Sequence, residues 1–159
     1  MSNFNLVFAY DQRAADCLEG RGHPHAAVRP GNCVPTTADM KWALDSIEDF
    51  VFDSPSGEEE LSVDEGNGCW MGIDGFDWDA PNTIPGDCFY IQGGPGMFQL
   101  LIKLCERCGQ LYFVPDTGAP AIVLDASLDA ATVYDLWIEV CQDHPYDAWT
   151  IFFEEMYGD

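Results

Sequence analysis

Alternation of apolar and polar side chains predicts several short strands. Phe4, Leu6, Phe8 and Tyr10 recur at every second position, so residues 3–10 are expected to form an opening strand. Comparable stretches predict further strands over residues 58–63, 69–73, 88–92, 111–114 and 121–124. The Gly-rich segment 65–68 and the segment 115–118 are expected to be turns that connect neighbouring strands.

Apolar side chains at helical spacing predict the helices. Thr36 or Thr37 is a suitable N-cap for a helix that runs to Phe52. A second helix is expected over residues 97–108, ended by Gly109. Two more are expected over residues 129–142 and 145–157. Residues 11–35 are rich in Gly and Pro and predict a long loop with one helical turn over 13–18.

These elements predict the fold class. Strands before and between helices, joined mostly by short connections, favour a single α+β domain spanning residues 1–159. We expect a mainly antiparallel sheet packed against about four helices. No apolar stretch approaches the roughly 18 to 20 residues that span a membrane, and no signal peptide is visible. The sequence thus predicts a cytoplasmic protein, and its odd number of cysteines, 7, excludes a complete set of internal disulfides.

The charge of the chain narrows the classes of partner. There are 28 Asp and Glu against 6 Lys and Arg, which gives a formal net charge of −22. Such a field repels nucleic-acid phosphates and anionic lipid, and it attracts basic proteins. Direct binding to nucleic acid or to a membrane is therefore not expected. An acidic enzyme adapted to high salt would have the same charge balance.

The acidic residues are densest where large aromatic residues are interleaved with them. This combination is typical of an interface in which aromatic side chains act as anchors and carboxylates pair with Arg or Lys of a basic partner. Strand alternation also allows the aromatic side chains to point into the core. The predicted partner-binding residues are Glu58, Glu59, Glu60, Asp64, Glu65, Trp70, Asp74, Phe76, Asp77, Trp78 and Asp79.

Three other patterns suggest ligands. Cys105 and Cys108, with Cys141 and His144 downstream, offer three thiolates and an imidazole for a zinc-binding regulator, although the first two fall on the apolar stripe of a helix. Asp77 and Asp79 resemble part of a calcium loop without its closing Glu. Gly93-Gly94-Pro95-Gly96 precedes a helix as a phosphate loop does, but no Lys-Ser/Thr follows.

No catalytic arrangement is recognisable in the chain. G-x-S-x-G does not occur, and Ser, Cys and His have no context typical of a triad. We therefore expect neither an enzyme nor a bound cofactor.

The pattern resembles the immunity proteins of bacterial type VI and contact-delivered toxin systems. The resemblance rests on small size, acidity, the α+β plan and the stretch GDCFYIQGGPGMFQLLIKLCERCGQLYFVPDTGAP over residues 86–120. It implies stoichiometric inhibition, in which an acidic face covers the basic active-site cleft of a toxin that is a nuclease or modifies nucleic acids or nucleotides. The alternative in the same class is a DNA mimic, for which regular acidic spacing along long helices would be expected.

Overall fold

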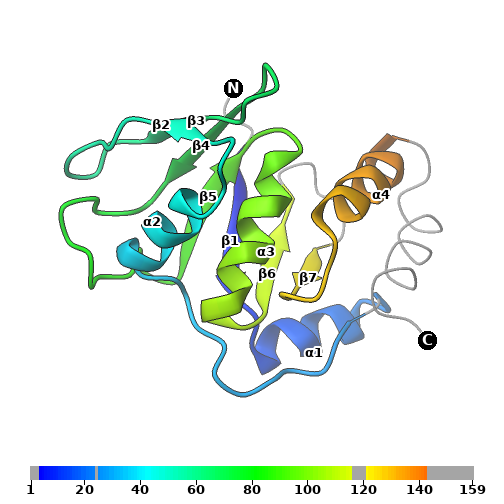
Figure 1. Cartoon of the computed structure of the whole chain (residues 1–159). Helices are drawn as coiled ribbons and strands as arrows, with labels where there is room; N and C mark the ends of the chain where they lie inside the picture. Colours follow the sequence, from blue (N-terminus) through cyan, green and yellow to red (C-terminus); the bar gives the residue numbers. More distant parts are fainter. Residues whose placement is uncertain (1–3, 24, 116–120, 143–159) are drawn as a thin grey trace.

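The computed structural model of the chain describes residues 4–23, 25–115 and 121–142 (Figure 1). These residues form one antiparallel sheet of seven strands, in the order β2-β3-β4-β5-β1-β6-β7. The strands are β1 (Asn5–Ala9), β2 (Val51–Phe52), β3 (Leu61–Asp64), β4 (Trp70–Asp74), β5 (Cys88–Gln92), β6 (Leu111–Val114) and β7 (Ile122–Leu124). The helices are α1 (Gln12–Gly20), α2 (Thr37–Asp45), α3 (Gly96–Cys108) and α4 (Ala130–Gln142).

The two faces of the sheet are covered to different extents. Every second side chain of the strands points to the face on which α2, α3 and α4 pack, and this face holds the larger core. Its centre includes Val7, Phe89 and Phe113, all fully buried, from the adjacent strands β1, β5 and β6. One end of the opposite face is covered by α1, whose Ala14, Ala15 and Leu18 pack on β6 and β7. The predicted fold class, α+β with an antiparallel sheet and four helices, is therefore confirmed.

The central strand β1 pairs with two strands that follow it by many residues. It is antiparallel to β5, with Leu6 opposite Tyr90, and to β6, with Phe8 opposite Tyr112. Alternation places Leu6, Phe8, Tyr90 and Tyr112 on the face that carries α1. This register determines which side chains lie together on that face.

The helix α1 is longer than the single helical turn predicted for this segment. Asp11 caps it, because its carboxylate accepts a hydrogen bond from the Ala14 amide at 2.8 Å. The buried residues of the helix are Ala14, Ala15 and Leu18, so a single large apolar side chain marks its buried face in the sequence.

The helix predicted to reach Phe52 ends instead at Asp45. Thr36 forms the expected capping box with Asp39. Beyond the helix the chain makes i-to-i−3 hydrogen bonds, from Ile47 to Leu44 and from Phe50 to Ile47. This tighter turn buries Ile47 and Phe50, so the apolar spacing continues after the helix has ended. Val51 and Phe52 then form β2.

Two further expectations concern the last predicted helix and membrane-spanning segments. The helix expected over residues 145–157 lies outside the residues that the structure describes. Within the described ranges, no helix has both the length and the apolar character needed to cross a bilayer.

Candidate functional site

Most of the predicted acidic residues are accessible at the half of the sheet formed by β2, β3 and β4. Glu58, Glu59 and Glu60 are exposed on the segment that leads into β3, and Asp79 is exposed on the loop after β4. Asp64, Asp74 and Asp77 are partly buried. The structure thus brings these carboxylates to one end of the molecule.

Two predicted aromatic anchors are buried in the core of the protein itself. Phe76 and Trp78 are 1% and 2% exposed, and the Phe76 ring lies 5.2 Å from the ring of Phe89. The Trp78 indole N–H donates to the Glu59 carbonyl oxygen at 2.6 Å. The backbone N–H of Trp78 donates to the Gly57 carbonyl oxygen at 2.7 Å. The expected contact of these two side chains with a partner is therefore corrected: they fix the loop after β4 to the segment before β3.

Glu65 is also removed from the predicted surface, because its carboxylate is buried at the start of α3. Its two oxygens accept hydrogen bonds from the backbone N–H groups of Gly94, at 3.1 Å, and Gly96, at 2.7 Å. A β-carbon on Gly96 would lie 2.6 Å from one of these oxygens, so the position requires glycine. The glycine segment that resembled a phosphate loop therefore holds an internal carboxylate.

Trp70 is the one predicted aromatic residue on the surface. It is 63% exposed, directly opposite Asp64 on β3, which in turn pairs with Val51 on β2. Trp70, Val51 and Asp64 line a groove of about 450 Å³ whose other walls include Asp53, Glu59 and Glu60. No Lys or Arg lines this groove, which we call the Trp70 groove.

The distribution of charge along the chain explains why the half of the sheet formed by β2, β3 and β4 is negatively charged. We call it the acidic half. Thirteen Asp and Glu residues lie between Lys41 and Lys103, and that interval contains no Lys or Arg. The interval includes β2, β3, β4 and β5. Its carboxylates therefore lack basic side chains from neighbouring parts of their own segment.

Four of the six basic residues have polar partners within the protein. The Arg107 guanidinium lies 3.9 Å from the Trp42 ring centroid and 3.7 Å from the Asp39 carboxylate. Lys103 pairs with Glu106, and Lys41 donates to the carbonyl oxygen of Trp78. The fourth, Arg29, belongs to the network described below. Three of these basic groups face carboxylates outside residues 42–102, whereas Lys41 brings its positive charge to the loop after β4.

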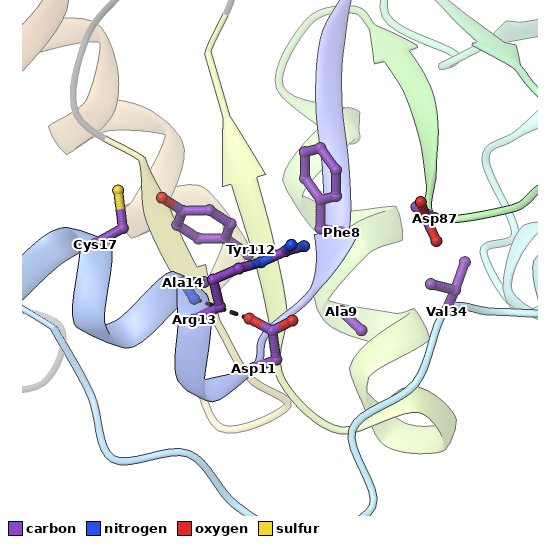
Figure 2. A pocket seen from close by; sticks show the side chains of 9 residues that line it. All are labelled: Phe8, Ala9, Asp11, Arg13, Ala14, Cys17, Val34, Asp87 and Tyr112. Carbon is purple, nitrogen blue, oxygen red and sulfur yellow. Dashed lines mark hydrogen bonds between the residues drawn. The ribbon is translucent and has the colours of Figure 1, made fainter.

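A second pocket lies at the edge of the part of the sheet that α1 covers (Figure 2). It has a volume of about 470 Å³ and is lined by Phe8 from β1, Tyr112 from β6 and Arg13 from α1, with Asp87 across from them. Burial raises the pKa of Tyr112, so its hydroxyl is neutral near pH 7. The sequence analysis missed this pocket, because alternation shows the strands without showing where a helix stops covering them.

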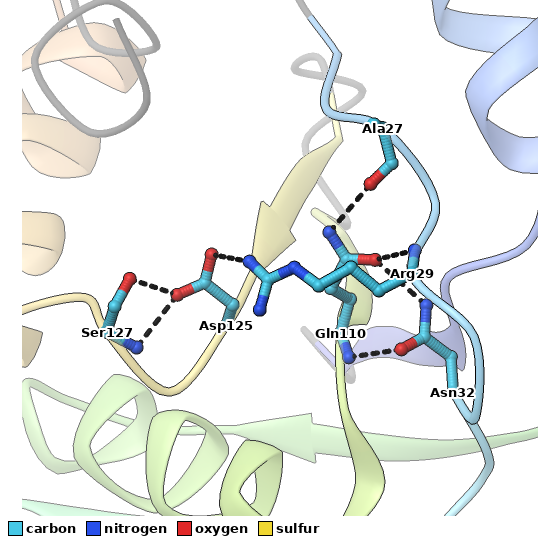
Figure 3. A network of polar contacts seen from close by, with 6 residues as sticks. All are labelled: Ala27, Arg29, Asn32, Gln110, Asp125 and Ser127. Carbon is cyan, nitrogen blue, oxygen red and sulfur yellow. Dashed lines mark hydrogen bonds and ion pairs between the residues drawn. The ribbon is translucent and has the colours of Figure 1, made fainter.

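A polar network ties the long segment after α1 to the sheet (Figure 3). Arg29 pairs with Asp125 at 2.8 Å, and Asp125 also accepts hydrogen bonds from the Ser127 amide and hydroxyl. The buried Gln110 side chain accepts from the Arg29 amide and from Asn32, each at 2.9 Å. The groups of this network bind one another, which gives it a structural role.

The thiols of the proposed zinc site lie in the protein interior. Cys105 and Cys108 are 5% and 0% exposed on the buried stripe of α3. Burial raises the pKa of both thiols, that of Cys108 to about 12, which opposes the thiolate form that zinc requires. The Cys141 side chain and His144 are outside what the structure describes, so the zinc hypothesis stays untested.

The remaining metal hypothesis concerns the loop after β4. The Asp79 carboxylate accepts a hydrogen bond from the Gly57 amide at 2.7 Å, and that of Asp77 accepts from the Asp79 amide at 3.1 Å. Among the residues with a described position, no three His, Cys, Asp or Glu side chains come together as metal ligands would. These two carboxylates act here as turn and loop contacts.

Comparison of the chain with protein-family models, with curated proteins and with solved structures gives no match.

Proposed function

We propose that this chain is a stoichiometric protein inhibitor of the immunity type, which acts in the cytoplasm and neutralises a basic bacterial toxin by covering its active-site cleft. The observation that carries the proposal is the concentration of acidic residues without any Lys or Arg between Lys41 and Lys103. This segment supplies four strands at one side of the sheet, so the negative field is concentrated there.

The chemistry of the surface supports a protein partner. Exposed carboxylates beside the accessible Trp70 offer both an ionic rim and an apolar contact, as protein interfaces do. A toxin whose cleft binds phosphates would present Arg and Lys to such a surface. The toxin would accordingly be a nuclease or an enzyme that modifies nucleic acids or nucleotides.

Capture of the partner from the native cells tests this function. The tagged chain is incubated with lysate, washed at low and high salt, and the bound proteins are identified by mass spectrometry. We expect one basic protein, bound in a 1:1 ratio, that is lethal when expressed alone and harmless when co-expressed with this chain. Recovery of no basic protein, or of one whose toxicity persists on co-expression, would contradict the proposal.

A further inference from the structure

Part of the sheet carries no described helix on one of its faces. Among the described residues, only α1 packs on the face opposite α2, α3 and α4, and it contacts the β6 and β7 end. Toward β1, β5, β4, β3 and β2, that face has no described helix over it. We call this region the open sheet face.

The open sheet face carries large apolar side chains. Val51, Trp70 and Tyr90 are 67%, 63% and 41% exposed. The Phe4 ring lies edge-on to that of Tyr90, with 6.5 Å between centroids, and the Phe8 ring lies 6.4 Å from that of Tyr112. The solvated face of an antiparallel sheet is ordinarily polar. Apolar side chains gathered on such a face indicate that another surface covers it.

Carboxylates surround this apolar strip. Asp64 lies opposite Trp70, and Asp74 lies opposite Tyr90 in the register of the sheet. The Glu60 carboxylate lies over Gly72, since a β-carbon on Gly72 would approach one of its oxygens to 2.5 Å. At the other end, Asp87 and Asp11 border the pocket beside Phe8, where Arg13 is the one basic residue in the lining.

We infer that the open sheet face, represented by Val51, Trp70, Tyr90, Phe4, Leu6 and Phe8, is the surface on which the basic partner docks. The inference rests on the proposed function and adds the location of the contact. The apolar strip forms the core of the interface, while Asp64, Asp74 and Asp87 at its rim pair with Arg and Lys of the partner.

Charge determines which occupant fits this face. A second copy of the chain would bring another net charge of −22, so the carboxylates at the rims would repel one another. Arginine suits the Trp70 end especially well, because its guanidinium stacks on an indole while binding a carboxylate. The protein already contains such a contact, in which Arg107 lies against Trp42 and Asp39. Trp70 and Asp64 supply the same two partners.

Peptide titration tests the location without knowledge of the partner. A nine-residue arginine peptide and a nine-residue lysine peptide are titrated into ¹⁵N-labelled protein at about 150 mM salt, where exposed charges are screened within about 8 Å. We expect the arginine peptide to shift the Trp70 indole and the amides of β4 and β5 more than the lysine peptide does. Equal effects of the two peptides, or shifts spread over all exposed acidic residues, would overturn the inference.

Matched variants then separate this inference from the proposed function. Trp70→Ser and Tyr90→Ser should each weaken binding of the captured basic protein by about tenfold or more, as loss of an interface anchor does. Ile84→Ser is the control, because Ile84 is 55% exposed on the loop before β5 and not on the sheet. Its affinity should stay within about twofold of the wild type.

Each remaining outcome has a distinct meaning. If a basic toxin is captured but both serine variants bind it as tightly as the wild type, the open sheet face is not the contact and the proposed function still stands. If no basic toxin is captured, the proposed function fails whatever the peptides show. Light scattering that finds a dimer lost in both serine variants would show that a second copy occupies the face, and would overturn the inference.

Discussion

At the scale of single residues, Glu65 shows how one carboxylate of a very acidic chain serves the fold. Its side chain is 4% exposed and its two oxygens receive amide hydrogen bonds at the start of α3. The positive end of the helix favours a negative charge at this position. The carboxylate therefore stabilises the helix that covers the centre of the sheet.

Replacing Glu65 tests this structural role. Glu65→Ala should lower the free energy of unfolding by roughly 1–3 kcal/mol, because it leaves the Gly94 and Gly96 amides without their acceptor. Glu58→Ala, at an exposed position, should change it by less than about 0.5 kcal/mol. Urea denaturation of both variants measures the difference, and equal stabilities would refute the capping role.

The thiol of Cys108 provides a second test, through pH. Burial, and next the neighbouring Cys33, raise its pKa from 9.0 to about 12, so the folded state favours the neutral thiol. This contribution to stability is complete below pH 9 and is lost as the pH rises through about 12. Between pH 8 and 10.5, urea denaturation should show a larger loss of stability for the wild type than for Cys108→Ala.

The exposed Cys17 is the matched control for that experiment. Cys17→Ala removes an exposed thiol in place of a buried one. If Cys108→Ala keeps the pH dependence of the wild type, the Cys108 thiol does not titrate differently in the folded and unfolded states.

The pattern of apolar and polar residues predicted some of the buried and exposed positions. Alternation in residues 69–73 places Trp70 on the side opposite Met71 and Ile73, which are buried, so its exposure follows from the strand. Phe76 and Trp78 lie in a loop, where no periodicity indicates direction. The partner of Glu65 is 29 residues away in the sequence, and local patterns contain no information about such a contact.

At the scale of elements, the segment from β3 to β5 contains two tryptophans with opposite roles. Trp78 joins the loop after β4 to the segment before β3 and lies in the main core. Trp70, eight positions earlier on β4, projects from the open sheet face. One residue type is thus buried in the core in one place and, in our proposal, contacts the partner in the other.

Alanine variants separate these two roles. Trp78→Ala should lower the free energy of unfolding by about 3–5 kcal/mol, because it empties a large core position. Trp70→Ala should cost less than about 0.5 kcal/mol, because its side chain is mostly in water. Chemical denaturation monitored by circular dichroism compares them, and similar losses for the two variants would contradict the assigned burial.

The elements were predicted where side-chain periodicity matched the backbone and mispredicted where it did not. The helix α3 and the strands other than β2 follow clear patterns. A single large apolar side chain marks the buried face of α1, while the stripe after α2 continues through a tighter turn. Strand order could not be predicted, since alternation shows which face a residue occupies and not which strand lies beside it.

At the scale of the whole molecule, the charge is unevenly distributed as well as large. The basic residues occur before residue 42 and after residue 102, and the acidic half lies between. The sequence was sufficient to predict a basic partner as a hypothesis. It could not show that, among the described helices, α1 alone packs on one face of the sheet and covers only its β6 and β7 end.

Charge reversal in two places tests whether the location of the charge matters. Glu58→Lys with Glu59→Lys and Asp16→Lys with Glu19→Lys change the net charge equally, all four positions being exposed. The first pair should slow association with the captured basic protein by about tenfold at low salt and flatten its salt dependence. The second pair, on α1, should have a smaller effect.

Stopped-flow or biosensor rates at about 50 and 300 mM salt provide this comparison. Equal slowing by both pairs would show that net charge alone steers the partner. Unchanged rates in both would show that the carboxylates of the acidic half interact with water and do not steer the partner. Asp77 and Asp79 are left unchanged in these variants, because their carboxylates hold the loop in place.

The central position of β1 has a consequence during synthesis on the ribosome. This strand leaves the exit tunnel before both of its neighbours, whose residues 88–92 and 111–114 are translated later. At about 5–20 residues per second, synthesis of the 83 residues after Ala9, through Gln92, keeps both edges of β1 unpaired for roughly 4–17 s. Unpaired edges invite aggregation, so holding by chaperones during this interval would raise the yield of folded protein. Folded protein would then appear in a cell no sooner than this time after the start of translation.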